Sequence, residues 1–362
     1  MRVLIIFNHP APYKVKAFNE LSKYVDLTVL FERTKAKDRP DDFYVANEYY
    51  FKPLFLKDGY IGNEGSISNK VRSFIKKNYL DYDIILMNGY SHLAEIKAIN
   101  YMYKHKIRFG LLINGGLIKK ESLLKKKIKT SLISKASFYI SPSRVADKYL
   151  IYYGADKNTI YPYLYSNYSS DEIIKEPLKD KTELRKEFNL PLDKKIFVNA
   201  AQFIDRKNNL QLISLFENRD DVLVLVGEGE KKEEYLSYIK SHNMNNVIIM
   251  NFMKKDRLFK LLRACDVYIT LSKEDIFGHT TLEAFSNGLP VISSNKVISS
   301  LEYIKNGYNG YIVDIKNSDE IIDAMNKTSY SLSINAIESA KNNTYESSAK
   351  SLYKVLGEIY EK

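Results

Sequence analysis

Residues Thr270 to Ser294, TLSKEDIFGHTTLEAFSNGLPVISS, join two predicted strands through a polar loop and a short helix. The first strand ends where this stretch begins, and the second begins at Pro290. We expect Thr280 to be the N-cap of the helix and Glu283 to complete a capping box, while Gly288 ends the helix. A loop that leads into a helix start directs backbone N–H groups and the positive end of the helix dipole at one point. Such a point suits a phosphate group.

Two carboxylates flank this predicted anion site. Asp275 precedes Gly278 in the loop, and Glu283 lies eight positions after Asp275, in the first turn of the helix. Both carboxylates also have structural interpretations. Glu283 would be present for the capping box alone, and Asp275 would be one charge in an exposed loop beside Lys273 and Glu274.

Length and composition indicate what kind of protein contains this loop. At 362 residues the chain predicts two domains of roughly 150–200 residues each. Its one cysteine, Cys265, excludes an internal disulfide, and its place just before an apolar strand predicts a buried structural thiol. The apolar run after Met1 is too short for a signal peptide, and no run reaches the ~18 apolar residues of a membrane span. We expect a cytoplasmic protein, with peripheral attachment to the inner face of the cell membrane as an alternative.

The net charge of +11 is partly concentrated in residues Lys119 to Lys135, KKESLLKKKIKTSLISK. Leucines and isoleucines at helical spacing separate the lysines, which predicts an amphipathic helix on an anionic surface, either lipid head groups or a polyanionic acceptor. The alternative is an ordinary surface helix whose apolar stripe packs inward. Nucleic acid is not an expected partner, because no basic and aromatic platform, zinc knuckle or recognition helix is visible.

Strands and helices alternate along the whole chain. Because most of the apolar runs are continuous and amphipathic helices separate them, we predict parallel sheets covered on both faces. The acidic pair Asp81 and Asp83 comes before a strand rather than after one, so we interpret it as a turn and expect no metal site. The predicted strands are residues 3–7, 26–31, 54–56, 84–87, 108–113, 138–140, 196–199, 222–226, 247–250, 267–270, 291–293 and 311–313.

Periodicity is lost between residues 161 and 192, where proline, serine and charged residues gather as they do in a linker. We therefore predict an α/β protein of two doubly wound, Rossmann-like domains at residues 1–165 and 166–344. A helix at 345–362 is expected to pack back towards the first domain. Ligands of such sheets bind at the carboxyl ends of the strands, so we expect a site in an interdomain cleft.

Three further loops that follow predicted strands contain candidate site residues. His9 and Tyr13 lie in and next to the Pro-rich segment after the first strand, where His9 is either an acceptor contact or part of a stiff turn. Arg206 and Lys207 stand at a helix entry after the seventh strand, where two cations either clamp a pyrophosphate or form an ordinary solvated pair. Gly227 begins the sequence GEGE, which lacks the third glycine of a dinucleotide fingerprint. We predict a tight turn there that lets the backbone approach a ligand.

The ordered set of these segments resembles the glycosyltransferase family 4 enzymes, also called group 1, which have the GT-B fold. The segments DIFGHTTLE, AFSNGLPVISS and EYIKNGYNGYIV, between Asp275 and Val313, follow the donor-site signature of this family. QFIDRKN, VGEGE and SPSRVADKYLIYYGADKNTIYPY stand in the family's order, and NHPAPYKVKAFNEL resembles the opening of its bacterial surface-polysaccharide branch. The resemblance covers nearly the whole chain and implies two Rossmann-like domains that face an interdomain cleft.

The resemblance implies a role for each matching residue. Glu283 would bind the ribose of a nucleotide sugar, Asp275 would lie near the donor hexose, and Lys207 would hold the diphosphate with help from Arg206. Gln202 stands where many members have a phosphate-binding arginine. The implied catalytic residues are Asp275, Lys207 and Glu283; the implied donor-binding residues are Gln202, Arg206, Lys207, Gly227, Gly278, His279, Thr280, Thr281 and Glu283; and the implied acceptor side comprises His9, Tyr13 and Asn114.

The implied function is retaining transfer of a sugar from a nucleoside diphosphate, with UDP favoured over GDP, to a glycan or lipid-linked acceptor. The pathway would be bacterial surface-polysaccharide synthesis. The departing phosphate would take the proton of the acceptor, and neither a metal nor a cofactor would be needed. Two alternatives stay open: a catalytically silent GT-B subunit that supports a partner, and a GT-B sugar-nucleotide epimerase.

Overall fold

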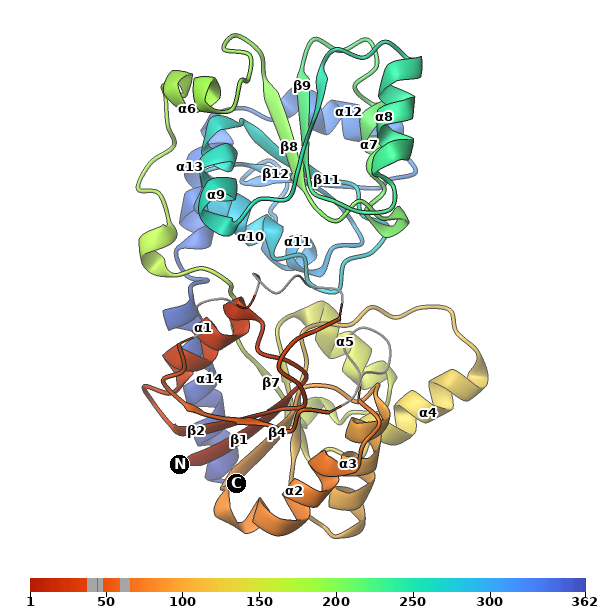
Figure 1. Cartoon of the computed structure of the whole chain (residues 1–362), viewed down its shortest axis with the longest axis vertical. Coiled ribbons are helices and arrows are strands. Elements are labelled where there is room, and N and C mark those ends of the chain that lie inside the picture. The colour runs from red at the N-terminus through yellow and green to blue at the C-terminus, as the bar shows by residue number, and fades with distance from the viewer. Residues whose placement is uncertain (38–43, 45–47, 59–65) are drawn as a thin grey trace. The chain divides into compact units, whose positions relative to one another are not determined.

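A computed structural model describes residues 1–37, 44, 48–58 and 66–362 (Figure 1). The chain forms two compact units, of which unit 1 comprises Met1–Tyr168 with Thr344–Lys362 and unit 2 comprises Ser169–Asn343. The sequence placed these divisions at residues 165 and 344. The C-terminal helix α14 (Tyr345–Tyr360) belongs to unit 1.

The described part of unit 1 contains a seven-stranded parallel sheet in the order β3-β2-β1-β4-β5-β6-β7. In its register, Val3 of β1 lies opposite Leu27 of β2 and Ile84 of β4. The strands are β1 (Arg2–Phe7), β2 (Asp26–Phe31), β3 (Lys52–Phe55), β4 (Ile84–Met87), β5 (Gly110–Leu112), β6 (Phe138–Ser141) and β7 (Ile160–Pro162). Besides α14, the helices are α1 (Pro12–Leu21), α2 (Lys70–Asn78), α3 (Leu93–Lys104), α4 (Leu123–Ile133) and α5 (Arg144–Tyr152).

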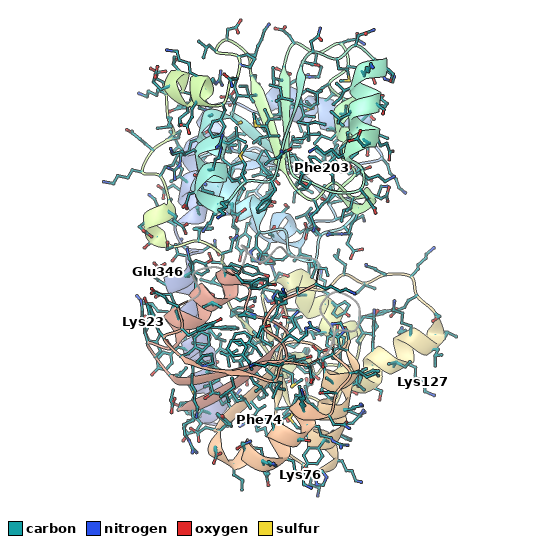
Figure 2. The ribbon with its side chains drawn as sticks, in the orientation of Figure 1. Lys23, Phe74, Lys76, Lys127, Phe203 and Glu346 are labelled. Atoms are coloured by element: carbon teal, nitrogen blue, oxygen red, sulfur yellow. The ribbon has the colours of Figure 1, made fainter. Side chains whose placement is uncertain are left out.

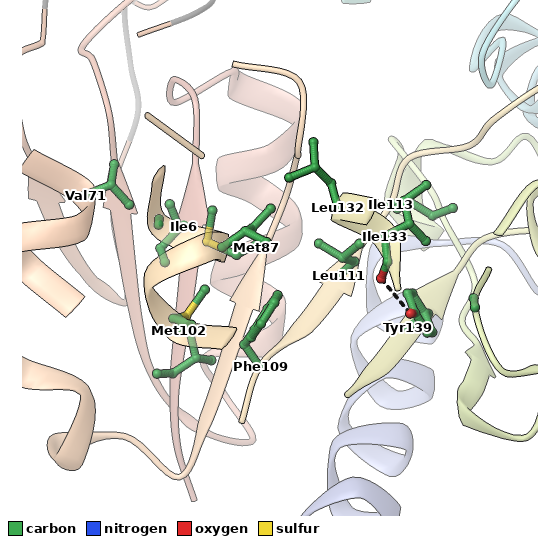
Figure 3. Packing of buried hydrophobic residues seen from close by; sticks show 14 of the residues in the cluster. Ile6, Val71, Met87, Met102, Phe109, Leu111, Ile113, Leu132, Ile133 and Tyr139 are labelled. Carbon is green, nitrogen blue, oxygen red and sulfur yellow. Dashed lines mark hydrogen bonds between the residues drawn. The ribbon is translucent and has the colours of Figure 1, made fainter. Parts of the chain in front are cut away.

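The core of unit 1 explains why its strands are continuous apolar runs. Figure 3 shows Ile6, Met87 and Leu111 from three neighbouring strands packed with Met102 of α3 and with Phe109. Each of these side chains is at most 1% exposed. Helices cover the sheet, so a strand in its centre has no face that favours polar residues.

The C-terminal helix α14 is fixed to unit 1 by aromatic and polar contacts. Tyr353 stacks on Tyr24, which follows α1, with the ring centroids 5.4 Å apart. The Arg108 guanidinium donates a hydrogen bond to the carbonyl of Ile359 at 2.9 Å. The chain therefore returns to its first unit after it has completed the second.

Two short segments of unit 1, at β7 and before β4, test predictions made from the sequence. The segment interpreted as a linker begins inside β7, an edge strand whose three residues are too few to give a periodic pattern and which ends at Pro162. Asp81 and Asp83 form the predicted turn before β4. Asp83 accepts hydrogen bonds from the backbone N–H of Arg2 at 2.7 Å and from its guanidinium at 2.9 Å.

Unit 2 contains a six-stranded parallel sheet in the order β10-β9-β8-β11-β12-β13 within its described residues. The predicted strands of this half are confirmed, with bounds that shift by one residue at most. They are β8 (Ile196–Ala200), β9 (Val222–Val226), β10 (Val247–Met250), β11 (Val267–Thr270), β12 (Val291–Ser294) and β13 (Gly310–Val313). The helices are α6 (Thr182–Glu187), α7 (Asn209–Ser214), α8 (Lys232–Ser241), α9 (Lys255–Ala264), α10 (Thr280–Ser286), α11 (Ile298–Tyr303), α12 (Ser318–Lys327) and α13 (Ser331–Ala340).

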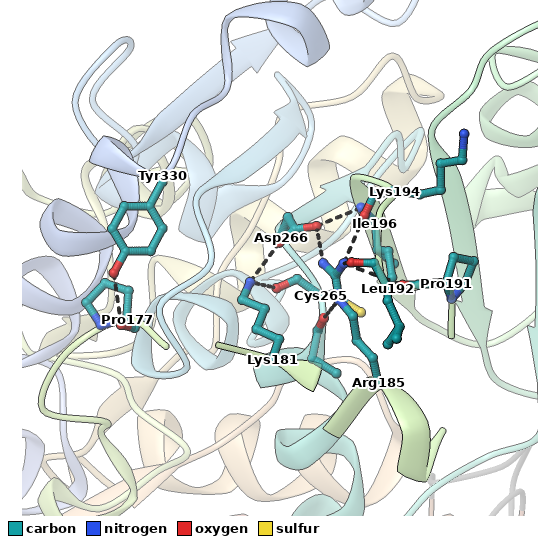
Figure 4. A network of polar contacts seen from close by, with 11 residues as sticks. Pro177, Lys181, Arg185, Pro191, Leu192, Lys194, Ile196, Cys265, Asp266 and Tyr330 are labelled. Atoms are coloured by element: carbon teal, nitrogen blue, oxygen red, sulfur yellow. Dashed lines mark hydrogen bonds and ion pairs between the residues drawn. The ribbon is translucent and has the colours of Figure 1, made fainter. Parts of the chain in front are cut away.

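A polar network ties α6 to the amino ends of β8 and β11 (Figure 4). Asp266 accepts hydrogen bonds from the Arg185 guanidinium at 2.7 Å, from Lys181 Nζ at 2.8 Å and from the backbone N–H of Ile196 at 2.8 Å. Arg185 is buried, and its paired charge avoids the cost of an isolated buried ion. The neighbouring Cys265 is fully buried as predicted, and burial raises the pKa of its thiol.

Candidate functional site

The loop between β11 and α10 is held in place by the segment that follows β12. The backbone N–H of Asp275 donates to the carbonyl of Lys296 at 2.9 Å, and that of Ser299 donates to the carbonyl of Phe277 at 2.7 Å. The Ser299 hydroxyl donates to the carbonyl of Gly278 at 2.6 Å. The loop that carries Asp275 is therefore fixed by backbone contacts with a segment about twenty residues further along the chain.

Gly278 is required by the close contact between these two segments. Its φ of +83° lies in the left-handed region. A Cβ at this position would lie 2.4 Å from Cγ1 of Val297 and 3.2 Å from Oγ of Ser299. A side chain here would push the loop away from the segment that positions it.

The start of α10 differs from the prediction. The N-cap is His279, which makes no side-chain cap hydrogen bond, and Thr280 is the first residue of the helix. The backbone of His279 already has helical dihedral angles, and the N–H of Thr281 donates to the carbonyl of Gly278 at 3.2 Å. Glu283 is therefore the fourth helical residue, one position beyond the one from which a capping-box side chain reaches back. The capping-box interpretation of Glu283 is wrong.

The structure brings Lys207 and Asp275 together. Lys207 ends the short helix η5 (Asp205–Lys207) after β8, and Asp275 follows β11, which is the neighbouring strand of β8. Lys207 Nζ lies 2.5 Å from Oδ2 of Asp275, and both side chains are largely buried. The Arg206 guanidinium donates to the carbonyl of Glu274 at 2.7 Å and lies 4.0 Å from Oδ1 of Asp275. Two predicted cations thus converge on one predicted carboxylate.

Tyr268 of β11 lies next to the candidate site residues, and sequence reasoning missed it. It is 1% exposed, its hydroxyl donates to the carbonyl of Ala200 at 3.3 Å, and the side chain of Thr280 hydrogen-bonds to it. Burial raises the pKa of this hydroxyl, and the negative charges of Glu283 and Asp275 raise it further. Both carboxylates therefore lie within electrostatic reach of one phenol. In the sequence, Tyr268 looked like any apolar residue of a buried strand.

The remaining predicted donor residues fall into different environments. Thr281 is fully buried, and its hydroxyl lies 2.9 Å from that of Ser300, so its side chain faces the protein. The His279 ring packs against Phe277 with the centroids 4.9 Å apart. Gln202 is exposed in the loop after β8. The roles expected for these residues stay predictions.

The turn at Gly227 joins the loops after β9 and β8. A Cβ on Gly227 would lie 1.9 Å from the carbonyl oxygen of Ala201, and the N–H of Phe203 donates to the carbonyl of Glu228 at 2.8 Å. The sequence predicted a close approach of this backbone to a ligand. The approach observed is to the neighbouring loop, which leaves no room for any side chain at Gly227.

In unit 1, the predicted acceptor-side residues lie after β1 and β5, at the carboxyl ends of the strands. His9 is buried, and its Nδ1 is 3.1 Å from the Tyr44 hydroxyl. Tyr13 is half-buried and hydrogen-bonds to Tyr165. The side-chain oxygen of Asn114 accepts a hydrogen bond from Lys14, which brings these two loops together.

Lys14 is a second residue that the sequence did not single out. It is 3% exposed, its Nζ donates to Oδ1 of Asn114 at 2.8 Å and lies 4.0 Å from the centroid of the Tyr165 ring. No carboxylate pairs with it within the described ranges of the chain. Burial lowers the pKa of this amine to about 7.

The lysine-rich helix α4 exposes much of its apolar surface. It begins at Leu123, four residues after the start of the lysine-rich stretch, where the Ser122 hydroxyl accepts a hydrogen bond from the backbone N–H of Lys125 at 3.3 Å. Leu123 is 86% exposed, Leu124 70% and Ile128 50%. Figure 2 shows Lys127 projecting from this helix. The inward-packing alternative is therefore wrong for the first turns of α4 and holds only for its last turn. Among the helices of the described residues, none has the length and apolarity to cross a membrane.

Part of the chain resembles known glycosyltransferases in sequence. Residues 180–343 match the family described as Glycosyl transferases group 1. The O-antigen biosynthesis glycosyltransferase WclY of Escherichia coli is 25% identical over 268 residues, which cover 69% of this chain and 73% of WclY. The N-acetyl-alpha-D-glucosaminyl L-malate synthase of Bacillus anthracis is 28% identical over 150 residues, which cover 40% of this chain and 39% of the synthase.

Solved structures resemble the chain over its whole length. HepE of Anabaena in complex with UDP has a TM-score of 0.77 at 17% identity, and the match covers 100% of both chains. Sucrose-phosphate synthase of Thermosynechococcus elongatus has a TM-score of 0.78 at 15% identity, again over 100% of both chains. At this level of identity the likeness concerns the fold, and it confirms the prediction of two Rossmann-like domains.

Proposed function

Because residues 180–343 belong to the group 1 glycosyltransferases and the chain has the GT-B fold, we propose that this protein is a retaining glycosyltransferase. It transfers a sugar from a UDP-sugar, in preference to a GDP-sugar, to a glycan or lipid-linked acceptor in bacterial surface-polysaccharide synthesis. The name of WclY, which places that relative in O-antigen biosynthesis, supports the acceptor class. The solved complexes of HepE with UDP and with UDP-glucose support the donor class.

The observation that carries this proposal is the pair of Lys207 and Asp275 at the carboxyl ends of two neighbouring strands. Departure of a sugar from its donor leaves negative charge on the diphosphate, and a preorganised cation stabilises that charge. Lys207 is the cation, with Arg206 beside it. Before the donor binds, Asp275 neutralises Lys207, so the lysine is not an isolated charge in a largely buried position.

The remaining steps follow from the same residues. Once the diphosphate pairs with Lys207, Asp275 is released to contact the hydroxyl groups of the donor sugar. The departing phosphate oxygen takes the proton of the acceptor hydroxyl on the same face of the sugar, which retains the anomeric configuration. Lysine and arginine, rather than a divalent cation, stabilise the charge of the departing diphosphate. Glu283 accepts hydrogen bonds from the ribose hydroxyls.

Donor binding and turnover test this proposal. The purified chain is incubated with a panel of UDP- and GDP-sugars, and nucleotide release and binding are measured. We expect one UDP-sugar to be bound and consumed. Failure of every donor to bind, at high protein concentration, would contradict the enzymatic function and favour the catalytically silent subunit. Formation of a different sugar nucleotide without release of UDP would identify the epimerase.

The variant Glu283→Ala tests the ribose contact. Because Glu283 is not a capping-box residue, its removal is expected to leave α10 intact and to weaken donor binding at least tenfold. Glu338→Ala, on the exposed surface of α13 in the same unit, is the matched control. Equal donor affinity of the wild type and Glu283→Ala would exclude the ribose role.

We also propose that α4 attaches the protein to an anionic membrane surface. The exposed side chains of Leu123, Leu124 and Ile128 are apolar, and Lys125 and Lys127 are exposed beside them. This combination fits the head-group region of a bilayer, where apolar side chains enter the acyl boundary and lysines meet lipid phosphates.

Cosedimentation with vesicles tests the attachment. We expect binding to vesicles that contain phosphatidylglycerol, weaker binding at high salt, and none to pure phosphatidylcholine. Leu123→Gln with Leu124→Gln should abolish the binding, whereas Leu80→Gln, at an apolar position that is 76% exposed elsewhere in unit 1, should not. Equal sedimentation of both variants with the wild type would contradict the proposal.

A further inference from the structure

A groove in unit 1 lies between α2 and α3, which pack side by side (Figure 1). Its volume is about 610 Å³, which is within the range of small-molecule sites. None of the described residues that line it is acidic, and several are basic. We call it the basic groove, and its lining includes Arg72, Lys76, Lys97, Asn100, Lys104 and His105.

The basic groove lies away from the candidate site residues of unit 1. His9 and Asn114 follow β1 and β5, at the carboxyl ends of the strands. Helix α3 begins after the carboxyl end of β4 and leads back to the start of β5, so its second half lies towards the amino ends. This second half lines the groove. A ligand there would therefore not compete for the residues expected on the acceptor side.

The cations of the basic groove stand in two facing stripes. Arg72 and Lys76 are four residues apart on α2, and Lys97 and Lys104 are seven apart on α3, so each pair lies on one face of its helix. Lys76 projects from α2 (Figure 2). Three of the four side chains are exposed and that of Lys97 is half-buried. A ligand from solution can reach all of them.

No carboxylate balances these four cations. In the part of the chain that the structure describes, none of them forms an ion pair, and Lys97 donates to the backbone carbonyl of Ile67 at 2.7 Å. Elsewhere on the surface of unit 1 a lysine does have such a partner, since Lys23 Nζ lies 2.6 Å from Glu20. Like charges one helical turn apart repel each other. A bound anion would relieve this repulsion.

Neutral side chains add hydrogen-bond donors to the basic groove. Lys135 Nζ donates to Oδ1 of Asn100 at 2.6 Å, so the amide oxygen is occupied and the exposed amide keeps its N–H groups for a ligand. The His105 ring packs on Tyr101 with the centroids 4.3 Å apart, which holds an imidazole at the groove. Positive charge together with many N–H donors is the chemistry that recognises phosphate oxygens.

We propose that the basic groove binds a soluble ligand that carries two or more phosphate groups. A phosphate ester has a charge of about −1.5 to −2 at pH 7, so two phosphate groups balance the four cations. The guanidinium of Arg72 contacts one phosphate through two parallel hydrogen bonds, and Lys76 and Lys104 meet the phosphates from opposite helices. The site uses none of the residues assigned to sugar transfer and does not depend on that reaction.

Calorimetric titration of the full chain with inorganic phosphate, pyrophosphate and tripolyphosphate tests the site. We expect the two condensed phosphates to bind more tightly than phosphate, and their binding to weaken as the salt concentration rises. Lys76→Gln with Lys104→Gln, the groove variant, should weaken this binding roughly tenfold or more, because two charge-assisted hydrogen bonds are lost. Lys77→Gln with Lys106→Gln is the matched control. It removes the same charge at neighbouring exposed positions outside the groove lining and should bind as the wild type does.

The proposed donor site also holds a diphosphate, so Lys207→Ala separates the two sites. This variant should keep the binding of tripolyphosphate to the basic groove. Loss of the binding in Lys207→Ala, with full binding by the groove variant, would place the anion at the donor site and overturn the proposal. Donor turnover is measured on the same samples, and the groove variant should keep it. Failure of the groove is therefore distinguishable from failure of the proposed transferase function.

Stability and vesicle binding complete the test. Without ligand, the groove variant should melt at or above the temperature of the matched control, because like charges have been removed. A lower melting temperature would show that the two lysines serve the fold, and it would overturn a ligand site. Failure of all three phosphates to bind the wild type, or equal affinity of the groove variant and the matched control, would do the same. So would a loss of binding to phosphatidylglycerol vesicles by the groove variant alone, which would assign the groove to lipid head groups.

Discussion

The carboxyl ends of the two sheets hold a largely buried lysine in different ways. Lys14 follows β1, the first strand of unit 1, and Lys207 follows β8, the first strand of the second sheet. Lys207 has the carboxylate of Asp275 at 2.5 Å. Among the residues that the structure describes, Lys14 contacts only the amide oxygen of Asn114, at 2.8 Å, and aromatic rings, and burial is the cause of its lowered pKa.

The difference between the two lysines determines how each would respond to an anionic ligand. In unit 2 the charge of Lys207 is balanced before any ligand arrives, so a diphosphate must replace Asp275 rather than fill an empty cationic pocket. In unit 1 the amine of Lys14 loses its proton at a much lower pH than an ordinary lysine does, because burial lowers its pKa to about 7. An amide and a ring stabilise an ammonium less than a carboxylate does. An anion that came near Lys14 would raise its pKa and draw a proton from solution.

Among the variants that test the contrast between Lys207 and Lys14, Lys207→Ala should have the largest effect, which is a loss of donor turnover. Loss of the cation that stabilises the leaving diphosphate is expected to reduce turnover of the donor by roughly 100- to 1000-fold. Nucleotide release from the donor identified by the panel measures it. Lys186→Ala, which breaks an exposed ion pair with Glu183 in the same unit, is the control and should keep wild-type turnover. Turnover of Lys207→Ala within threefold of the wild type would remove Lys207 from the mechanism.

Lys14→Met should change how stability depends on pH. Between about pH 7 and the ordinary lysine pKa of about 10.4, unfolded Lys14 binds a proton that the folded state has lost, so its contribution makes stability rise with pH. The slope is at most about 1.4 kcal/mol per pH unit. The methionine variant should lack this rise and be more stable than the wild type at pH 7.

Denaturant unfolding at pH 6, 7, 8 and 9 measures the slope for both proteins. Lys16→Met is the control, because Lys16 lies two residues further along α1 and is exposed. Its stability should follow that of the wild type at every pH. Parallel curves for Lys14→Met and the wild type would mean that Lys14 keeps its proton in the folded state, and the contrast with Lys207 would then disappear.

The fold was predictable because its signals are local. Continuous apolar runs and the amphipathic segments between them identify most of the strands. The loops after the strands contain Lys207, Arg206 and Asp275, which the family resemblance assigned to one donor site. The missed strand β7 is three residues long, and no periodicity can be read from so short a segment. The start of α10 was misplaced by one residue, which is enough to remove the capping-box interpretation of Glu283.

The missed site residues depend on tertiary contacts. Tyr268 was hidden in an apolar strand, and only the folded loop shows that Thr280 lies against its hydroxyl. Lys14 is one of four charged or amide residues of an amphipathic helix, and only its burial under Tyr165 and Phe7 distinguishes it from Lys16. Residue type and spacing in a sequence do not report burial, and burial gives both of these side chains their shifted pKa.

Asp275→Asn tests the same contrast between Lys207 and Lys14, and we expect it to have the smallest effect. The variant removes the carboxylate that competes with a diphosphate for Lys207 and makes the surroundings of this lysine resemble those of Lys14, which already faces an amide. We expect UDP to bind severalfold more tightly, because Lys207 no longer has to leave a carboxylate, while transfer falls because the contact with the donor sugar is lost. Calorimetric titration with UDP measures the first effect and nucleotide release the second. Asp323→Asn, at an exposed ion pair with Lys327, should change neither. Weaker UDP binding by Asp275→Asn would show that Asp275 orients Lys207 towards the diphosphate instead of competing with it.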